Sequence, residues 1–215
     1  MGILNVSRGL FATALLTFAM TANAAFIDFT DESWSAAIDD GSKTTATLGN
    51  VTLTALNGNL TFNASDKGGC VAGQPTNGLT CDGDGIGVNN DEITQAGNEF
   101  TSSDQTITIS FAEAVDITNL YVLDLFGSEG NGEIAVIDSV GYQAPVGNLG
   151  IAGGYYATGF TGLGITSIVL TGNEDYFSDY ALAAIDVEIS AVPLPGALIL
   201  FGSALLGMFG FKRFS

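Results

Sequence analysis

Short runs in which apolar and polar residues alternate dominate the middle of this chain. The clearest is Thr106–Phe111, where Ile107, Ile109 and Phe111 take every second position. A period of two places apolar side chains on one face of a β-strand and polar ones on the other. Clusters of Gly, Asn, Asp and Ser, which are typical of turns, separate the runs. The sequence therefore predicts strands at Ala25–Phe29, Thr44–Leu48, Asn50–Leu56, Asn59–Phe62, Gln105–Phe111, Ile117–Phe126, Glu133–Asp138, Thr166–Leu170 and Tyr180–Ile189.

Eight or nine short strands in one domain predict an all-β fold, a two-sheet β-sandwich of the jelly-roll type. The closing run Asp179–Ile189 resembles the last strand of galactose-binding-like jelly rolls, which implies pairing with the first strand near Phe26–Phe29. Asn57-Gly58 predicts a hairpin between the strands that flank it, because a type I′ turn needs positive φ at both central residues. Ser33–Asp39, with apolar residues four apart, predicts a short helical turn.

Residues 1–24 have the organisation of a secretory signal peptide. One charge, Arg8, precedes an apolar run from Leu10 to Met20, and Ala22-Asn23-Ala24 has the small-x-small form of a signal-peptidase site. The apolar run is shorter than the roughly 20 residues that span a bilayer. We expect a signal helix that signal peptidase removes after Ala24, and an exported domain over residues 25–191.

Residues 192–215 have the features of a second targeting signal. Gly196–Phe211 is uncharged and mostly apolar, and Lys212 and Arg213 follow it at once. This predicts a short transmembrane helix whose basic stop stays on the cytoplasmic side of the inner membrane. The exported domain then faces outward.

The same segment resembles the PEP-CTERM sorting signal in its VPLPA-type variant. The motif Val192-Pro193-Leu194-Pro195, a glycine-broken apolar helix and a terminal basic pair stand in the order of that family. The resemblance implies a Gram-negative bacterium that makes exopolysaccharide and an exosortase-type enzyme that cleaves near the Pro motif. It also implies a protein that is anchored in the membrane transiently and ends on the cell surface or outside the cell. It implies no catalytic role for this chain.

The charge of the chain excludes several functions. There are 23 Asp and Glu against 5 Lys and Arg, with no His. Residues 25–191 contain all 23 acidic residues and only two basic ones, Lys43 and Lys67, so their formal charge is −21. Nucleic acid is excluded as a partner, because phosphate binding needs clustered cations. Ser-His-Asp triads and His-ligated zinc sites are excluded as well, whereas divalent cations are natural counterions.

The segment Gly68–Phe100 is rich in Gly, Asn, Asp and Thr and predicts a long loop. In an exported chain the two cysteines, Cys70 and Cys81, predict a disulfide that closes part of this loop. The oxygen-bearing side chains that follow predict a calcium site, with calcium as cofactor, built from Asp82, Asp84, Asn89, Asp91 and Glu92. The alternative is a solvated acidic loop pinned by the disulfide. The stretch Gly85–Val88 with Asp91-Glu92-Ile93 also resembles a segment of the jelly-roll ectodomains of PEP-CTERM proteins, which implies that Ile86 and Val88 lie in the core and that Asp91-Glu92 face a cation or a backbone turn.

Two further hypotheses concern ligands. Tyr155 and Tyr156 follow two glycines and predict a glycan-binding pair, since exposed rings stack on sugars; the alternative is that they pack in the sandwich. Carboxylate pairs such as Asp31-Glu32, and Asp124 with Glu133, allow glycoside hydrolysis as a remote alternative. We expect a non-enzymatic structural or binding protein of the exopolysaccharide or biofilm matrix, with a calcium-dependent carbohydrate-binding module as the alternative.

Overall fold

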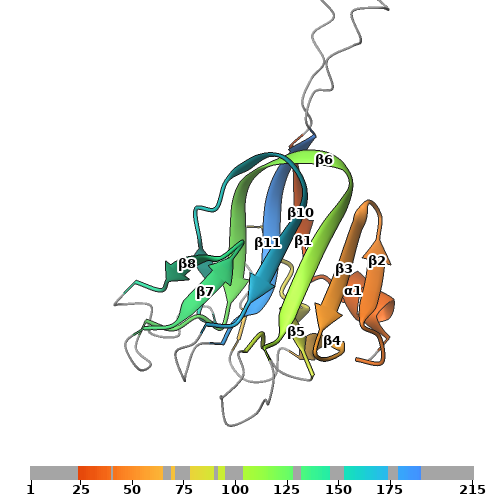
Figure 1. The fold of residues 1–215 in the computed structure, drawn as a ribbon. Coiled ribbons are helices and arrows are strands. Elements are labelled where there is room, and N and C mark those ends of the chain that lie inside the picture. The colour runs from red at the N-terminus through yellow and green to blue at the C-terminus, as the bar shows by residue number, and fades with distance from the viewer. Residues whose placement is uncertain are drawn as a thin grey trace, which may run out of the picture.

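The computed structural model describes residues 24–39, 41–64, 69–70, 78–89, 92–94, 104–127, 132–145, 153–173 and 179–189. These residues form an all-β fold with a single short helix (Figure 1). The elements are β1 (Ala24–Asp28), α1 (Glu32–Ile38), β2 (Thr45–Leu48), β3 (Val51–Leu56), β4 (Leu60–Ala64), β5 (Gly83–Val88), β6 (Thr106–Leu123), β7 (Ile134–Ile137), β8 (Val140–Gln143), β9 (Tyr156–Ala157), β10 (Gly162–Thr171) and β11 (Ala181–Ile189).

Strand β6 connects the two halves of the sheet. Its first part pairs with β3 and β10, and its second part pairs with β11 and β9. Figure 1 shows it arching over the top of the molecule, and shifts of register in its pairing with both β10 and β11 accompany the bend. The path of hydrogen-bonded neighbours runs β4-β5-β11-β6-β10-β7-β8. The sheet therefore curves around a shared interior.

The alternation seen in the sequence orients side chains toward that interior. Along the first part of β6, Ile107 and Ile109 are fully buried, whereas Thr106 and Thr108 between them are half-buried. In β3, Leu53 is likewise fully buried and lies opposite Ile109. Removing such side chains from water contributes about 25 cal/mol per Å² of apolar surface, which makes this core the main source of stability.

Helix α1 closes one end of the core. Asp31 caps it by accepting the Ser33 N–H at 2.8 Å, and it ends at Asp39, whose φ of 59° is left-handed. The buried side chains of α1 are Trp34 and Ile38, and the Trp34 ring lies 5.1 Å from that of Phe29. The helical turn predicted from the spacing of these two residues is confirmed.

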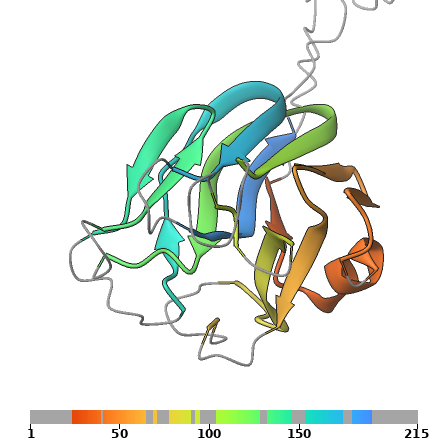
Figure 2. The same cartoon turned by 60° about the horizontal axis from the view of Figure 1, so that its bottom comes forward.

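The first and last strands are neighbours. β1 pairs with β11 in antiparallel register from Ala24 opposite Glu188 to Asp28 opposite Ala184. Figure 2 shows β1 beside β11, with β3 on its other side. The predicted pairing of the closing strand with the first strand is confirmed.

Other sequence predictions are corrected by the pairing. The hairpin across Asn57-Gly58 is wrong, because β3 pairs with β2 and β6 whereas β4 pairs with β5. The turn is held instead by Asn89, whose side chain accepts the Asn59 N–H at 3.0 Å and donates to the Asn57 carbonyl at 3.3 Å. Two predicted strands, Gln105–Phe111 and Ile117–Phe126, are one continuous strand, and the short strands β8 and β9 were not predicted.

The predicted long loop Gly68–Phe100 contains strand β5. Its Ile86 and Val88 are fully buried, as the resemblance of the stretch Gly85–Val88 implied. At Gly85 φ is 90°, and a Cβ there would lie 2.5 Å from the Leu182 carbonyl oxygen. Glycine is therefore needed for β5 to approach β11.

The predicted signal peptide up to Asn23 and the whole predicted sorting segment, including its Pro motif and basic stop, lie outside the described residues. Ala24, the last residue of the predicted signal, is the first residue of β1. Within the described residues no helix has the length and hydrophobicity needed to cross a membrane.

Candidate functional site

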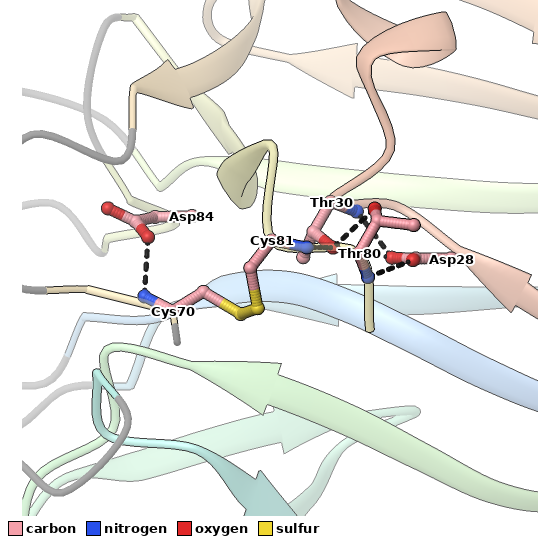
Figure 3. Close-up of a disulfide and its surroundings, with 6 residues drawn as sticks. All are labelled: Asp28, Thr30, Cys70, Thr80, Cys81 and Asp84. Carbon is pink, nitrogen blue, oxygen red and sulfur yellow. Dashed lines mark hydrogen bonds between the residues drawn. A yellow bond between two sulfur atoms is a disulfide. The ribbon is translucent and has the colours of Figure 1, made fainter. Parts of the chain in front are cut away.

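The Cys70–Cys81 disulfide fastens a loop onto one face of the sheet. The two Cα atoms lie 5.3 Å apart, and the predicted bond is confirmed (Figure 3). On one side of the bond the Cys70 N–H donates to Asp84 at 2.6 Å. On the other side the Cys81 N–H donates to the Thr30 hydroxyl at 3.0 Å. Each half of the disulfide is thus anchored to a different strand end.

Asp28 organises the second anchor. One carboxylate oxygen accepts the N–H and the hydroxyl of Thr30, at 2.8 and 2.6 Å, and the other accepts the Thr80 N–H at 2.7 Å (Figure 3). Hydrogen bonds to a carboxylate are stronger than those between neutral groups. They hold the loop against the end of β1.

The predicted calcium ligands that the structure describes have separate hydrogen-bond partners or positions. Asp82 accepts the Glu32 N–H at 3.2 Å, at the start of α1, while Asp84 accepts from Cys70. Asn89 holds the turn after β3, Glu92 is half-buried and Asp91 lies outside the described residues. Among the residues that the structure describes, no three carboxylate or sulfur side chains gather as a metal site would require. Calcium binding by this segment stays a prediction.

Three aromatic rings lie side by side on the face that carries the disulfide. We call Phe26, Tyr121 and Tyr155 the aromatic row. Tyr155 stacks on Tyr121 with ring centres 5.7 Å apart and planes at 15°, and the Phe26 ring meets Tyr121 edge-on at 6.0 Å. The Tyr121 hydroxyl donates to Asp186 at 2.6 Å. The row thus offers aromatic faces and edges beside a carboxylate.

The row changes the acidity of its phenols. Burial raises the pKa of Tyr155 to about 12, and the electrostatic effects of Tyr121 and of the Asp186 carboxylate act in the same direction. Burial also raises the pKa of Tyr121, together with its hydrogen bond to the Asp186 carboxylate. Both phenols therefore remain neutral donors throughout the physiological range.

The rings of Tyr155 and Tyr156 pack against different clusters. Tyr155 contacts the small cluster around Cys70, Leu79 and Ala184, whereas Tyr156 packs against the main core from β9. Successive residues of an extended chain point to opposite faces, which separates the two rings. The ring that accompanies Tyr155 is Tyr121, which is distant in sequence and was not predicted.

A cleft opens between β1 and the β2–β3 pair, and we call it the β1 cleft. Its volume is about 430 Å³. Its apolar lining includes Trp34 from α1, Phe111 and Val115 from β6, and Val187 from β11, all largely buried. Pockets that bind ligands in proteins have volumes of roughly 300–1,000 Å³ and mostly apolar walls.

The rim of the β1 cleft is acidic. Asp31 and Glu113 line it, and both residues are exposed or half-exposed. The salt bridge that joins Lys43 to Asp39 at 3.7 Å lies outside the lining of this cleft. The cleft thus combines an apolar floor with a negative rim.

One edge of β1 faces the cleft, and no strand of the described residues pairs with it. Among the described strands β1 pairs with β11 alone. The Phe29 N–H donates to the Ala183 carbonyl at 2.8 Å, so the backbones of residues 29, 27 and 25 point toward β11. Because backbone polar groups alternate in an antiparallel pair, those of Phe26 and Asp28 point away from it. Both residues line the cleft.

The carboxylate pairs considered for hydrolysis have local structural partners. Asp31 caps α1, and Glu133 is buried and accepts the Phe126 N–H while its own N–H donates to the Phe126 carbonyl at 3.0 Å. Glu133 is thus hydrogen-bonded to Phe126 through both its side chain and its backbone.

Comparison with known proteins adds no assignment: no family model, no curated protein and no solved structure matches this chain.

Proposed function

We propose that this chain is an exported, non-catalytic protein of the bacterial cell surface or extracellular matrix. The observation that carries the proposal is the Cys70–Cys81 disulfide, because such bonds persist in oxidising compartments outside the cytoplasm. The strongly acidic exported domain would stay soluble by self-repulsion in that setting. The role is structural or binding, within exopolysaccharide or biofilm.

The proposal includes processing at both ends. Ala24 lies opposite Glu188 in the β1–β11 pair, so the predicted signal peptide and the predicted sorting segment would leave the same end of the domain. That arrangement suits a chain held to the inner membrane while signal peptidase and an exosortase-type enzyme act on it. The domain itself we assign to the two-sheet jelly rolls, supported by the β1–β11 pairing and by the passage of β6 from one half of the sheet to the other.

Expression in a Gram-negative host with and without an exosortase tests the sorting proposal. With the enzyme we expect a mature form that lacks both ends and leaves the membrane fraction. Replacing Pro193 and Pro195 by Ala should leave the chain in the membrane fraction with its sorting segment attached. The matched control is Pro75→Ala, which removes a proline outside the motif. Release of the doubly substituted chain at the normal rate would contradict the proposal.

A second candidate function is carbohydrate binding, favoured by the aromatic row. Phe26, Tyr121 and Tyr155 present ring surface beside Asp186, and sugars are bound by rings together with carboxylate acceptors. Titration calorimetry of the chain with the producing organism's polysaccharide, in calcium and in chelator, tests it. We expect loss of binding in Tyr155→Ala and retention in Tyr156→Ala, whose ring packs inward. Equal binding by all three proteins would exclude the row as the site, and turnover of the polysaccharide would favour the glycosidase alternative.

A further inference from the structure

We propose that the β1 cleft binds an extended, cationic peptide segment of a partner protein, which pairs with the free edge of β1 as an added strand. This inference is separate from the proposed sorting, and it uses the backbone of Phe26, whose ring belongs to the aromatic row. It rests on three features of the cleft: an unpaired strand edge, an apolar floor and a negative rim.

The edge supplies the hydrogen bonds. Phe26 and Asp28 each direct a backbone N–H and a C=O away from β11 and line the cleft. An unpaired strand edge is a ready template for another extended chain. Main-chain hydrogen bonds give the affinity in this mode of recognition, and pockets for alternate side chains give the specificity.

The floor supplies the pocket for those side chains. An added strand would point every second side chain toward the interior, where Trp34, Val115 and Val187 form an apolar lining. Valine or isoleucine at these positions would be removed from water. Burial of one such side chain is the main apolar gain that the cleft offers.

The rim sets the charge of the partner. Asp31 and Glu113 stand at the mouth of the cleft, and the exported domain as a whole carries −21. Lys or Arg at the outward positions of the added strand would be attracted by this field, whereas an acidic segment would be repelled. A second copy of this chain is disfavoured for the same reason.

Trp34 gives a direct assay, because it is the one tryptophan of the sequence, is 2% exposed and lines the cleft. The full chain in neutral detergent is titrated with an acetylated six-residue peptide that alternates lysine and valine. We expect a saturable change in tryptophan fluorescence. A peptide alternating glutamate and valine should cause none, and neither should the lysine peptide with N-methyl groups on alternate amides.

Two substitutions of Phe26 distinguish binding through the backbone edge of β1 from binding through the Phe26 ring. Phe26→Pro removes the outward N–H, while the β1–β11 hydrogen bonds made by neighbouring residues stay in place. Phe26→Pro should weaken the binding of the lysine peptide about five- to tenfold. Phe26→Ala keeps the N–H, and its affinity for the lysine peptide should lie within about twofold of that of the unchanged chain. Glu113→Gln should weaken the binding of the lysine peptide about two- to fivefold, as expected for the loss of an exposed charge pair.

Four outcomes would overturn the proposal. Equal losses in Phe26→Pro and Phe26→Ala would assign binding to the ring, and equal binding of the acidic peptide would remove the role of the rim. A fluorescence change with oligosaccharide but with no peptide would assign the cleft to sugars. Self-association that Phe26→Pro abolishes would make a second copy the occupant. Should Phe26→Pro fail to fold by circular dichroism, the N-methylated peptide alone decides whether main-chain hydrogen bonds are used.

Discussion

Removal of the Cys70–Cys81 bond should lower the free energy of unfolding by about 3 kcal/mol. The cysteines are 11 residues apart, and the loss of loop-closure entropy in the unfolded chain for a loop of that length gives this magnitude. In a domain of this size the same loss lowers the melting temperature by about 6–12 °C. The hydrogen bonds from Cys70 to Asp84 and from Cys81 to Thr30 use backbone N–H groups, so they survive replacement of the side chains.

The assay is urea unfolding of residues 24–189, from the first to the last strand, followed by tryptophan fluorescence. The unchanged protein, the same protein reduced with a phosphine, and Cys70→Ala with Cys81→Ala are compared. The reduced protein is the matched control, because it lacks the bond but keeps both side chains. A loss below about 1 kcal/mol in both samples would refute the entropic reasoning, and a loss confined to the double variant would assign the effect to packing.

Three further predictions concern calcium, Asn89 and Tyr155. Calcium should raise the melting temperature of the unchanged chain. Asp82→Asn with Asp84→Asn should abolish this rise while keeping both hydrogen-bond acceptors. A melting temperature of the unchanged chain that does not move in calcium would contradict the calcium site. Asn89→Gly, at a residue with φ 62°, should lower the free energy of unfolding by about 1 kcal/mol through the two lost side-chain hydrogen bonds, equally with and without calcium. A loss seen in calcium alone would assign Asn89 to calcium and not to the turn. The pKa of Tyr155 in the folded protein is about 12, above its ordinary value of 10. The stability that Tyr155 contributes is therefore intact below pH 10 and declines as the pH rises toward 12. Unfolding free energies equal to those of Tyr155→Phe across this pH range would contradict the raised pKa.

Local patterns in the sequence were sufficient for the parts of the fold that face water on one side. The alternation in Thr106–Phe111 predicted the strand, the buried face and the position of Ile107 and Ile109. The spacing of Trp34 and Ile38 predicted α1 for the same reason, since one face of the element is apolar. In these segments the period of the pattern is itself the signal.

The pattern failed where the backbone is constrained by a neighbour. β5 reads as a glycine-rich loop, because close approach to Leu182 removes the side chains that would have shown alternation. Asn57-Gly58 reads as a hairpin turn, but the partner of that turn is Asn89, about thirty residues away. Neither contact leaves a local trace in the sequence.

The candidate sites were the least predictable part. The disulfide followed from two cysteines in a chain with a predicted signal peptide. The aromatic row and the β1 cleft join residues from distant segments, such as Phe26 with Tyr121 and Trp34 with Val187. Periodicity gives the face of a residue within its own strand but does not give the strand that will lie beside it.

The pairing of β1 with β11 has a consequence for how the molecule is made. A ribosome delivers Ala24 long before Glu188, so β1 lacks its one partner among the described strands, β11, until almost the whole domain has been synthesised. Contacts this far apart in sequence slow folding, and an unpaired strand is open to aggregation in the meantime. We therefore expect nascent chains that stop short of β11 to need a holding chaperone at β1, and the domain to become resistant to proteases in one late step when its final strand is complete.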